Sequence, residues 1–404
     1  MAITSIENID FSEKKVVIRL DLNVPIQNKK IQDITRIERI IPTLKMILSK
    51  NPKYIVILSH LGRPKPKPPS LWDEDNSLAI IKPSLQKLLE LPITFTKKPI
   101  GPELYHLLKT VPNHSIILAE NIRFYEGEEE NSDAFSKAIS QLGDIFVNEA
   151  FSCSHRKHAS VVGITKHLPS YAGLCLNEEL HALGGILTHP NRPTIGIVAG
   201  SKISTKIDLL LNLLNQLDYL FLGGGMANTF LKAEGYKIGK SLVENEYLDT
   251  AKTIMKKAQT SKCRLVLPID VVVAKELKTN TPTAIVDIDM VDDEQAIYDI
   301  GPKTIEKLKN ILQSCKTVVW NGPVGAYEIS PFAQGSIAIT KIITQQTKTQ
   351  ELISIAGGGD TIAVIAESAA EFTYVSTAGG AFLEWLEGKK LPGIESLDPD
   401  QIVV

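Results

Sequence analysis

The sequence predicts an α/β protein with two domains, each built on a parallel sheet that helices cover on both faces. Three observations lead to this fold class. The chain has 404 residues, which is more than one ordinary domain holds. Short runs rich in Val, Ile and Leu alternate with helix-like segments, as in buried parallel strands. The residues that follow these runs also differ in chemistry between the two halves of the chain.

We expect a strand in each apolar run. In the first half the runs are "KVVIRLDLNV" (15–24), "YIVILSH" (54–60), "SIILAENIRF" (115–124) and "DIFVNEAF" (144–151). In the second half they are "TIGIVAG" (194–200), "YLFLGGG" (219–225), "RLVLPIDVVV" (264–273), "TVVWNGP" (317–323), "LISIAGGG" (352–359) and "FTYVSTAGG" (372–380). The segment 177–193 begins with a helical pattern and ends in prolines, so we expect the domain boundary there.

Composition argues against several classes of function. Hydrophobic residues make up 43% and charged residues 22%, which is normal for a globular protein of enzyme size. The net charge of −2 gives no basic field for nucleic acid or for an anionic membrane. No apolar run has the length of a membrane span, and the N-terminus lacks a signal-peptide pattern. Four scattered cysteines fit reduced thiols, so we expect a cytoplasmic protein.

The strands of the first half are followed by polar and cationic residues. In parallel α/β sheets, ligands bind at the carboxyl ends of the strands. The residues at these ends are Asp21, Asn23, His60, Arg63, Asn121, Arg123, His155, Arg156 and His158. Only eight of the 44 basic residues are arginines, and six of the eight lie in the first 160 residues. The planar arginine fork grips carboxylate and phosphate, so the first half is expected to form a basic cup for a small acid.

The strands of the second half end mostly in glycine. In "ELISIAGGGDTIAVIAESAAE", Gly357, Gly358 and Gly359 join an expected strand at 352–356 to an expected helix that starts at Thr361. Helix N-termini have unpaired amides and a positive dipole end, and together with a glycine loop they make an anion site. Asp360 is either a helix cap or a functional carboxylate, and this segment alone does not decide between them.

Two further motifs fit a phosphate-binding second half. Lys202 and Lys206 lie four residues apart at the start of an expected helix, 201–214, where cations oppose the dipole unless an anion binds. Glu328 follows the turn in "VVWNGPVGAYE". It is either a solvent-exposed turn residue or a residue that binds a sugar hydroxyl. "GYKIGKS" (235–241) has the wrong spacing for a Walker A loop and is read as a structural loop.

Taken together, the motifs resemble the phosphoglycerate kinase family over nearly the whole chain. The matching segments are "RLDLNVP", "SHLGRP", "ENIRF", "EAFSCSHRKHAS", "AGSKISTKIDLL", "LGGGMANTF", "WNGPVGAYE", "AGGGDT" and "STAGGAFLEWLEGKKLPG". The resemblance implies two similar doubly wound parallel-sheet domains joined by a helix and a hinge. It implies an acid-binding N-terminal domain at 1–175, an interdomain helix and hinge at 176–190, and a nucleotide-binding domain at 191–391. It also implies that the tail 392–404 packs back on the N-terminal domain.

The resemblance also implies the ligands and their residues. A monomer would transfer a phosphoryl group between 1,3-bisphosphoglycerate and ADP, giving 3-phosphoglycerate and ATP in glycolysis, with Mg²⁺ carried by the nucleotide. The residues implied for the acid are Asp21, Asn23, Arg36, His60, Arg63, Arg123 and Arg156. Those implied for the nucleotide are Lys206, Gly301, Glu328, Gly357, Gly358, Gly359, Asp360 and Thr361, with Asp360 also binding the metal. Arg36, Lys202, Gly358 and Gly359 would act on the moving phosphoryl group.

A few positions depart from the family pattern. Ala199 and Ala378 stand where glycine is usual, Ala119 replaces a bulkier residue, and "AIYDIGPKT" lacks the usual Met-Gly-Leu. None of these departures removes a charge. Two other functions remain open at this stage: a non-enzymatic module that closes on a small anion, and a kinase for a different acid.

Overall fold

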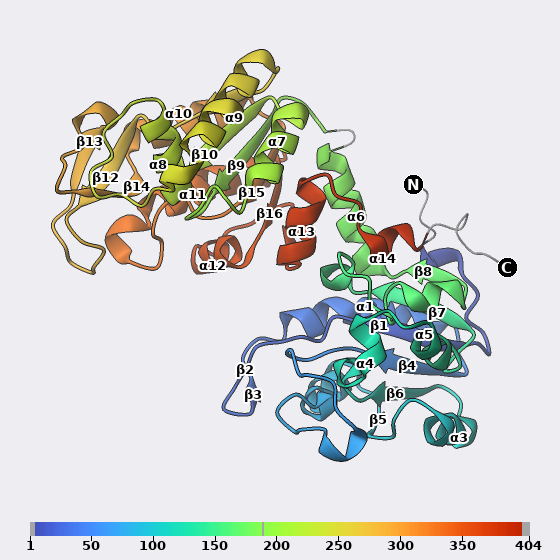
Figure 1. The fold of residues 1–404 in the computed structure, drawn as a ribbon. Coiled ribbons are helices and arrows are strands. Elements are labelled where there is room, and N and C mark those ends of the chain that lie inside the picture. The colour runs from blue at the N-terminus through green and yellow to red at the C-terminus, as the bar shows by residue number, and fades with distance from the viewer. Residues whose placement is uncertain (1–4, 188–189, 398–404) are drawn as a thin grey trace. The chain divides into compact units, whose positions relative to one another are not determined.

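The computed structural model describes residues 5–187 and 190–397 and divides the chain into two compact units. Unit 1 holds residues 1–181 and 390–404, and unit 2 holds residues 182–389. Each unit contains a six-stranded parallel sheet with helices packed against it (Figure 1). The predicted fold class is therefore confirmed. Within the described ranges, no helix is both long and apolar enough to cross a membrane.

Unit 1 is built on a sheet with the strand order β5-β6-β4-β1-β7-β8, and every neighbouring pair is parallel. The strands are β1 (Lys15–Leu20), β4 (Tyr54–Leu58), β5 (Ile93–Thr96), β6 (Ser115–Ala119), β7 (Ile145–Glu149) and β8 (Ser170–Ala172). The helices are α1 (Thr35–Ser49), α2 (Lys82–Leu89), α3 (Pro102–Thr110), α4 (Glu126–Glu129), α5 (Asp133–Ser140) and α14 (Pro392–Glu395). A short hairpin, β2 (Ile26–Gln27) and β3 (Lys30–Ile31), precedes α1.

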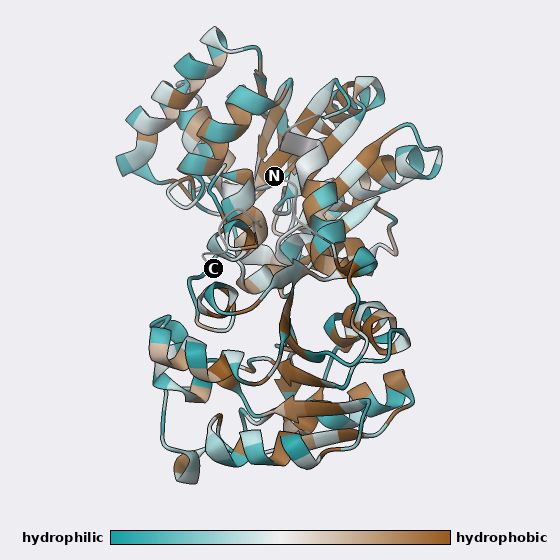
Figure 2. Ribbon diagram, turned by 90° about the vertical axis from the view of Figure 1, so that its right-hand side faces the viewer, coloured by the Kyte–Doolittle hydropathy of each residue, from teal (hydrophilic) through white to brown (hydrophobic). Residues whose placement is uncertain are grey.

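Both faces of this sheet are buried, which explains the continuous apolar runs. Successive strand residues point to opposite faces. Val16 and Ile18 of β1 pack in one core with α1 and α2, whereas Val17 packs in a second core with α3 and α5. The strands accordingly appear as hydrophobic segments between more polar helices (Figure 2).

Unit 2 repeats this plan with the parallel strand order β11-β10-β9-β15-β16-β17. Its strands are β9 (Thr194–Ala199), β10 (Tyr219–Gly223), β11 (Arg264–Val266), β15 (Thr317–Asn321), β16 (Ile353–Gly357) and β17 (Tyr374–Ser376). Its helices are α7 (Ile207–Gln216), α8 (Gly224–Ala233), α9 (Leu248–Thr260), α10 (Pro302–Ser314), α11 (Gln334–Lys348), α12 (Gly359–Glu367) and α13 (Gly379–Leu386). Trp320 of β15 is fully buried in the core beneath α10, α11 and α12.

One predicted strand is wrong in its extent and its pairing. The run 264–273 forms two strands, because Pro268 and the residues beside it interrupt the ladder. Only β11 joins the parallel sheet. The second part, β12 (Asp270–Ala274), pairs antiparallel with β13 (Ala284–Asp287) and β14 (Ala296–Ile300) in a separate three-stranded sheet. An apolar run alone does not distinguish parallel from antiparallel partners.

The helix expected at 201–214 begins later, at Ile207. Residues 201–206 form a turn instead. Glu244 holds this turn, because its carboxylate accepts hydrogen bonds from the backbone amide and the hydroxyl of Ser204, at 3.0 and 2.6 Å. Lys202 and Lys206 therefore precede the helix rather than lying on its first turns. The loop at 235–241 has neither helix nor strand, as predicted.

The chain returns to unit 1 near its C-terminal end. The amide of Gly393 donates to the carbonyl of Ser154 at 2.8 Å, and its carbonyl accepts from Asn148 Nδ2 at 3.3 Å. Residues 392–397 thus lie beside the end of β7. The rest of the tail predicted at 392–404, from 398 onward, lies outside the described residues.

A buried carboxylate at the end of β7 holds the start of α6 (Leu174–Leu187), and the division between the two units falls within this helix. Glu149 accepts hydrogen bonds from the amides of Cys175 and Leu176, each at 3.0 Å, and from the hydroxyl of Thr43 in α1. These amides belong to the first turn of α6, where no partner exists within the helix. Glu149 therefore joins β7, α1 and α6.

Replacing Glu149 by Ala should lower the free energy of unfolding of unit 1 by about 2–4 kcal/mol, because two buried donors and one partly buried donor lose their acceptor. Urea denaturation of the full chain measures this loss. The control is Glu130→Ala, which removes an exposed carboxylate and should change stability by less than about 0.5 kcal/mol. Equal stability of both variants would show that Glu149 does not hold the helix.

Candidate functional site

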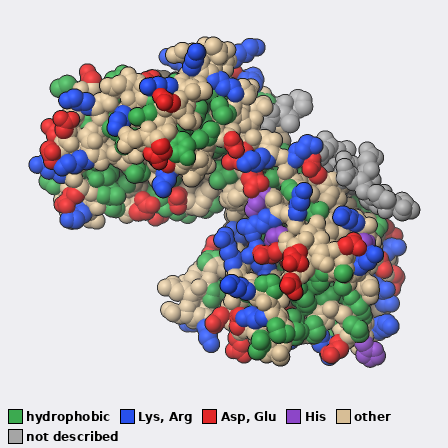
Figure 3. All heavy atoms as spheres, viewed as in Figure 1, with side chains coloured by type: hydrophobic (Ala, Val, Ile, Leu, Met, Phe, Trp, Pro, Cys, Tyr) green, Lys and Arg blue, Asp and Glu red, His purple; other side chains and the backbone are tan. Residues whose placement is uncertain are grey.

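Two groups of predicted site residues lie at the carboxyl ends of the two parallel sheets. In unit 1, the loops after β1, β4, β6 and β7 carry the predicted arginines and histidines. Lys and Arg side chains gather beside His side chains on one face of this unit (Figure 3). Because these four strands are neighbours in the sheet, residues far apart in sequence come together there.

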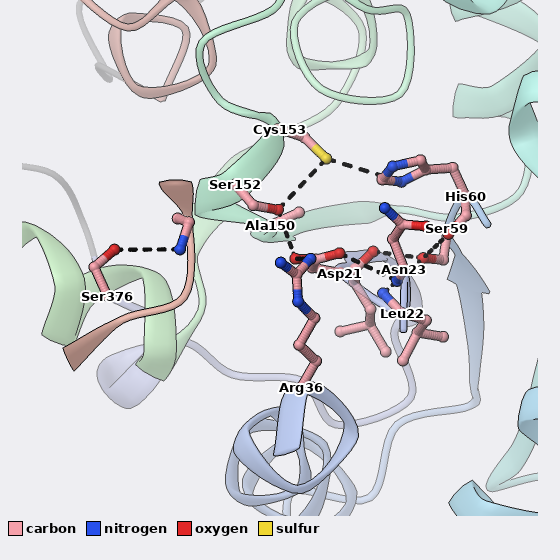
Figure 4. A network of polar contacts seen from close by, with 12 residues as sticks. Asp21, Leu22, Asn23, Arg36, Ser59, His60, Ala150, Ser152, Cys153 and Ser376 are labelled. Carbon is pink, nitrogen blue, oxygen red and sulfur yellow. Dashed lines mark hydrogen bonds and ion pairs between the residues drawn. The ribbon is translucent and has the colours of Figure 1, made fainter. Parts of the chain in front are cut away.

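Asp21, which follows β1, forms an ion pair with Arg36 and so holds Arg36 beside the other predicted acid-binding residues. Arg36 Nη1 lies 2.6 Å from Asp21 Oδ2, and the Ser152 hydroxyl donates to the same oxygen at 2.6 Å (Figure 4). Arg36 comes from the first turn of α1, so the pair connects that helix to the loops after β1 and β7. The Arg36 side chain keeps 29% of its surface exposed.

His60, which follows β4, is held as a neutral donor. Arg19 of β1 is 1% exposed, and its Nη2 contacts His60 Nδ1 at 3.1 Å. A guanidinium can only donate, so His60 Nδ1 accepts and the ring proton sits on Nε2. Burial, together with the charges of Arg19, Arg123 and Arg156, keeps the pKa of His60 well below its usual range. His60 Nε2–H thus remains a donor for an anion.

Arg123 and Asn23 anchor the loop after β4. Arg123 is 4% exposed, and its Nη1 donates to the Gly62 carbonyl at 3.3 Å. The amide of Gly62 in turn donates to Asn23 Oδ1 at 2.9 Å. Arg63 comes next in this loop and is exposed to solvent. The structure thus brings these predicted residues together around one loop.

The loop after β7 adds Arg156 and His158. Arg156 Nε donates to His155 Nε2 at 3.0 Å. Burial and the charges of Arg19, Arg123 and Arg156 lower the pKa of His158 to about 3. The same positive surroundings would favour a bound anion, because each cationic neighbour lowers the energy of negative charge. Unit 1 therefore presents a candidate anion site in which the histidines are neutral and the arginines carry the charge.

In unit 2, a pocket of about 640 Å³ lies at the carboxyl ends of the strands. Six of the predicted nucleotide residues line it: Lys206, Glu328, Gly358, Gly359, Asp360 and Thr361. The volume falls in the range typical of small-molecule sites, about 300–1,000 Å³. The structure thus collects residues from the loops after β9, β15 and β16 in one cavity.

The start of α12 forms the part of the pocket whose chemistry suits a phosphate group. Gly358 has φ +102°, and a Cβ there would lie 2.8 Å from Asn321 Nδ2, so both its conformation and its close approach require glycine. Helix α12 begins at Gly359, so the amides of its first turn have no partner within the helix, and Gly359, Asp360 and Thr361 line the pocket. Thr361 Oγ1 accepts from the amide of Gly322 at 2.7 Å and fixes the neighbouring loop. Gly357 ends β16 just before this turn.

Lys206 lies beside these amides. Its Nζ donates to Asn321 Oδ1 and to the Ala199 carbonyl, each at 2.6 Å. Burial lowers the pKa of Lys206 to about 8, while the nearby Asp360 carboxylate acts to raise it. An anionic ligand would raise this pKa again, since it favours the charged form.

Three predicted residues, Lys202, Gly301 and Gly357, lie outside the pocket lining. Lys202 is exposed in the turn before α7 and lies outside the pocket lining, although Ser201 and Thr205 of the same turn line it. Glu328 lines the pocket with an exposed side chain. Gly301 is buried at the N-cap of α10, outside the lining, and packs against Asp270. Its neighbours Asp299 and Ile300 line the pocket instead.

Sequence reasoning missed several residues of both sites. Arg19 was one, although a single arginine inside the apolar run 15–24 is a signal of a buried functional charge. Asn321 was another: its amide links Lys206 to the Gly357 carbonyl, the latter at 2.8 Å. Its position at the end of a strand, before Gly322, could have identified it. Ser152 gave no signal, because its contact with Asp21 depends on the tertiary fold.

The fold defines a class of two-unit α/β proteins with a parallel sheet in each unit and a candidate anion site at the carboxyl edge of each sheet. The family model for phosphoglycerate kinase matches residues 6–389, and the chain belongs to this family. It is 46% identical to a phosphoglycerate kinase of Rhodospirillum centenum over 98% of this chain and all of that one. The structure of the Coxiella burnetii phosphoglycerate kinase matches with a TM-score of 0.91 and 41% identity, covering 98% of both chains. That of the Pyrococcus horikoshii enzyme matches with a TM-score of 0.80 and 27% identity, again covering 98% of both chains.

The lowered pKa of His158 predicts a loss of stability in acid. In the unfolded chain this group titrates near 6.5, so between pH 6.5 and about 3 the unfolded chain binds more protons than the folded one. Stability contributed by neutral His158 is present above pH 6.5 and decreases as the pH falls through this window. Replacement by Gln should reduce the stability difference between pH 7 and pH 5 by about 2 kcal/mol. Urea denaturation at both pH values measures this difference.

The matched control for His158→Gln is His106→Gln, which changes an exposed histidine on α3. This control measures the effect of replacing a histidine by Gln at a position outside the cluster of arginines. A wild-type pH dependence retained in His158→Gln would show that His158 does not titrate as the structure indicates.

Proposed function

We propose that this phosphoglycerate kinase, a phosphotransferase by its family, moves a phosphoryl group reversibly between 1,3-bisphosphoglycerate and ADP, giving 3-phosphoglycerate and ATP. The observation that carries this proposal is the pocket of unit 2, where Lys206, the first turn of α12 and the carboxylate of Asp360 meet. A cation and helix amides bind phosphates, and an exposed carboxylate beside them suits a metal-bound nucleotide. Membership of the family supports the same activity.

Unit 1 would bind the acid. The proposed contacts come from the arginine-rich cup of Asp21, Asn23, Arg36, His60, Arg63, Arg123 and Arg156. Arginines suit both the phosphate and the carboxylate of this ligand, because their planar donor forks match both groups. Neutral His60 adds a donor without adding charge. In this proposal Asp21 acts by positioning Arg36, because its Oδ2 already accepts hydrogen bonds from Arg36 and Ser152.

Unit 2 would bind ADP or ATP. The phosphates would meet the amides at 357–361 and Lys206, and Glu328 would accept from the ribose hydroxyls. The residues present fit a magnesium ion: Asp360 is an exposed carboxylate in the first turn of α12, and Mg²⁺ in nucleotide sites takes one or two carboxylates together with phosphate oxygens and waters. When bound there, Mg²⁺ would neutralise charge on the phosphate chain. Gly301 would contribute only by shaping the adjacent backbone.

The proposed chemistry is direct in-line transfer without a covalent enzyme intermediate. Phosphoryl transfer needs positioning and positive charge around the equatorial oxygens. Arg36, Lys202 and the amides of Gly358 and Gly359 would supply this charge. No general base is needed, because the carboxylate acceptor is ionised at neutral pH.

Transfer also requires that the two ligands meet. The acid site is built from unit 1 and the nucleotide site from unit 2, whereas reacting atoms must approach to about 3–3.5 Å with water excluded. We therefore propose a hinge closure that uses the chain between the units, including the segment 176–190. We further propose that the enzyme is a monomer, works in the cytoplasm and serves glycolysis.

An assay with ATP and 3-phosphoglycerate, with and without magnesium, tests this proposal. ADP should form only when the acid and the metal are both present. A module that merely closes on an anion would bind 3-phosphoglycerate without forming ADP. A panel of other carboxylic acids separates the proposed enzyme from a kinase for a different acid: faster turnover of another acid would overturn the substrate assignment.

Replacing Asp360 by Ala should weaken binding of Mg-ADP while leaving the affinity for 3-phosphoglycerate nearly intact, because Asp360 belongs to the pocket of unit 2 alone. Calorimetric titration with each ligand measures both affinities. Glu367→Ala, at the far end of the same helix, is the control and should change neither. Equal losses for both ligands in Asp360→Ala would indicate that Asp360 is a structural cap.

Replacing Arg36 by Ala should lower kcat by about 10³- to 10⁵-fold with a much smaller change in either KM, as expected for a cation that meets charge mainly in the transition state. Steady-state kinetics measures this, with Lys45→Ala as a control that removes an exposed charge from the same helix. If kcat stays within tenfold while the KM for the acid rises steeply, Arg36 serves binding only.

A further inference from the structure

The pocket of unit 2 has two chemically different ends. Lys206 and the start of α12 form a charged end. Aliphatic side chains form the other end: Leu231, Leu242, Pro268, Val271, Leu277 and Ile297. Under the proposed function, the phosphates occupy the charged end. The flat, weakly polar base then lies against the aliphatic side chains, since pockets of this kind are mostly apolar with a few polar groups that set orientation.

Asn228 is a polar residue within this aliphatic region. It lines the pocket, is 1% exposed, and lies on α8 three residues before Leu231, so the two side chains share one face of the helix. Its Nδ2 donates to the carbonyl of Leu242 at 3.2 Å. Leu242 is itself part of the lining. Asn228 therefore stands where the base would lie, not at the phosphate end.

The hydrogen bond to Leu242 fixes the orientation of the Asn228 side-chain amide and leaves its oxygen without a donor. If the amide were reversed, its oxygen would face the Leu242 carbonyl, and two acceptors would oppose each other. The oxygen Oδ1 is therefore the remaining polar atom. It is buried, and among the residues that the structure describes no group donates to it. A buried acceptor without a donor is unfavourable and rare in native proteins, so a donor group on a ligand bound in this pocket would satisfy it.

We propose that Asn228 Oδ1 accepts a hydrogen bond from the exocyclic 6-amino group of adenine, and that Asn228 thereby selects adenine nucleotides over 6-oxopurine nucleotides. The 6-amino group of adenine is a donor, whereas the 6-oxo group of guanine and hypoxanthine is an acceptor. A 6-oxo base would place two acceptors together in a buried region. This inference rests on the proposed nucleotide site and adds a residue that determines base specificity.

The test compares three Mg-bound diphosphates that differ at position 6 of the purine: ADP, purine riboside diphosphate with hydrogen at that position, and IDP with oxygen. Calorimetry on the wild-type protein should give ADP about 2- to 12-fold tighter binding than purine riboside diphosphate, the range expected for one neutral hydrogen bond. IDP should bind no better than purine riboside diphosphate. The wild-type measurements need no variant, so they stand even if a substitution fails to fold.

Asn228→Leu then assigns the difference to this residue. Leu keeps the approximate volume but has no acceptor, so ADP and purine riboside diphosphate should bind it equally. Loss of the bond to the Leu242 carbonyl affects all ligands alike and cancels in the ratio. The control Asn310→Leu, at an exposed position on α10, should retain the wild-type ratio.

Two outcomes would overturn the proposal in distinguishable ways. A wild-type ratio near one, or an equal ratio in wild type and Asn228→Leu, would refute the role of Asn228 while ATP-dependent turnover of 3-phosphoglycerate still supported the enzyme. Absence of any Mg-ADP binding, together with absence of turnover, would refute the nucleotide site itself.

Discussion

Both candidate sites depend on the parallel arrangement of strands in the two sheets. In a parallel sheet all carboxyl ends meet at one edge, and the side chains that follow them converge there. In unit 1 the four neighbouring strands β6, β4, β1 and β7 bring together cationic and amide side chains. In unit 2 the same geometry brings together the loops after β9, β15 and β16. One topology thus gives two candidate anion sites of different chemistry.

The two candidate sites reduce the repulsion between neighbouring positive charges in different ways. Unit 1 buries Arg19 among Ser160, Ser59 and His60, and it keeps the neighbouring histidines neutral. Buried Glu128 accepts from Ser160 and lies near Arg19, although burial raises its pKa. Unit 2 relies on helix amides and a lysine, which leaves the Asp360 carboxylate exposed. A carboxylate there can serve a metal-bound nucleotide, whereas in unit 1 Asp21 is already engaged by Arg36.

The sequence predicted the fold class and most candidate residues because buried strands and their polar ends leave local patterns. The predictions from sequence were wrong where contacts with residues distant in the chain determine the local structure. Glu244 accepts hydrogen bonds from Ser204 and holds the turn at 201–206, so that α7 begins only at Ile207. The sequence near Ser204 does not indicate this distant partner. The run 264–273 is equally apolar in a parallel and in an antiparallel sheet, so the separate sheet of β12 could not be foreseen. Gly301 was predicted from the family resemblance alone, yet its place outside the pocket lining depends on how α10 packs on Asp270.

Hydrogen exchange of the full chain with one ligand at a time tests the central claim, that each unit holds its own anion site. With 3-phosphoglycerate alone, protection should increase in the loops after β1, β4, β6 and β7, and the segment 357–361 should exchange as in the free protein. With Mg-ADP alone, protection should increase at 357–361 and in the loops after β9 and β15, while the loops of unit 1 stay unchanged. Protection of both sets of loops to the same extent by either single ligand would contradict the account.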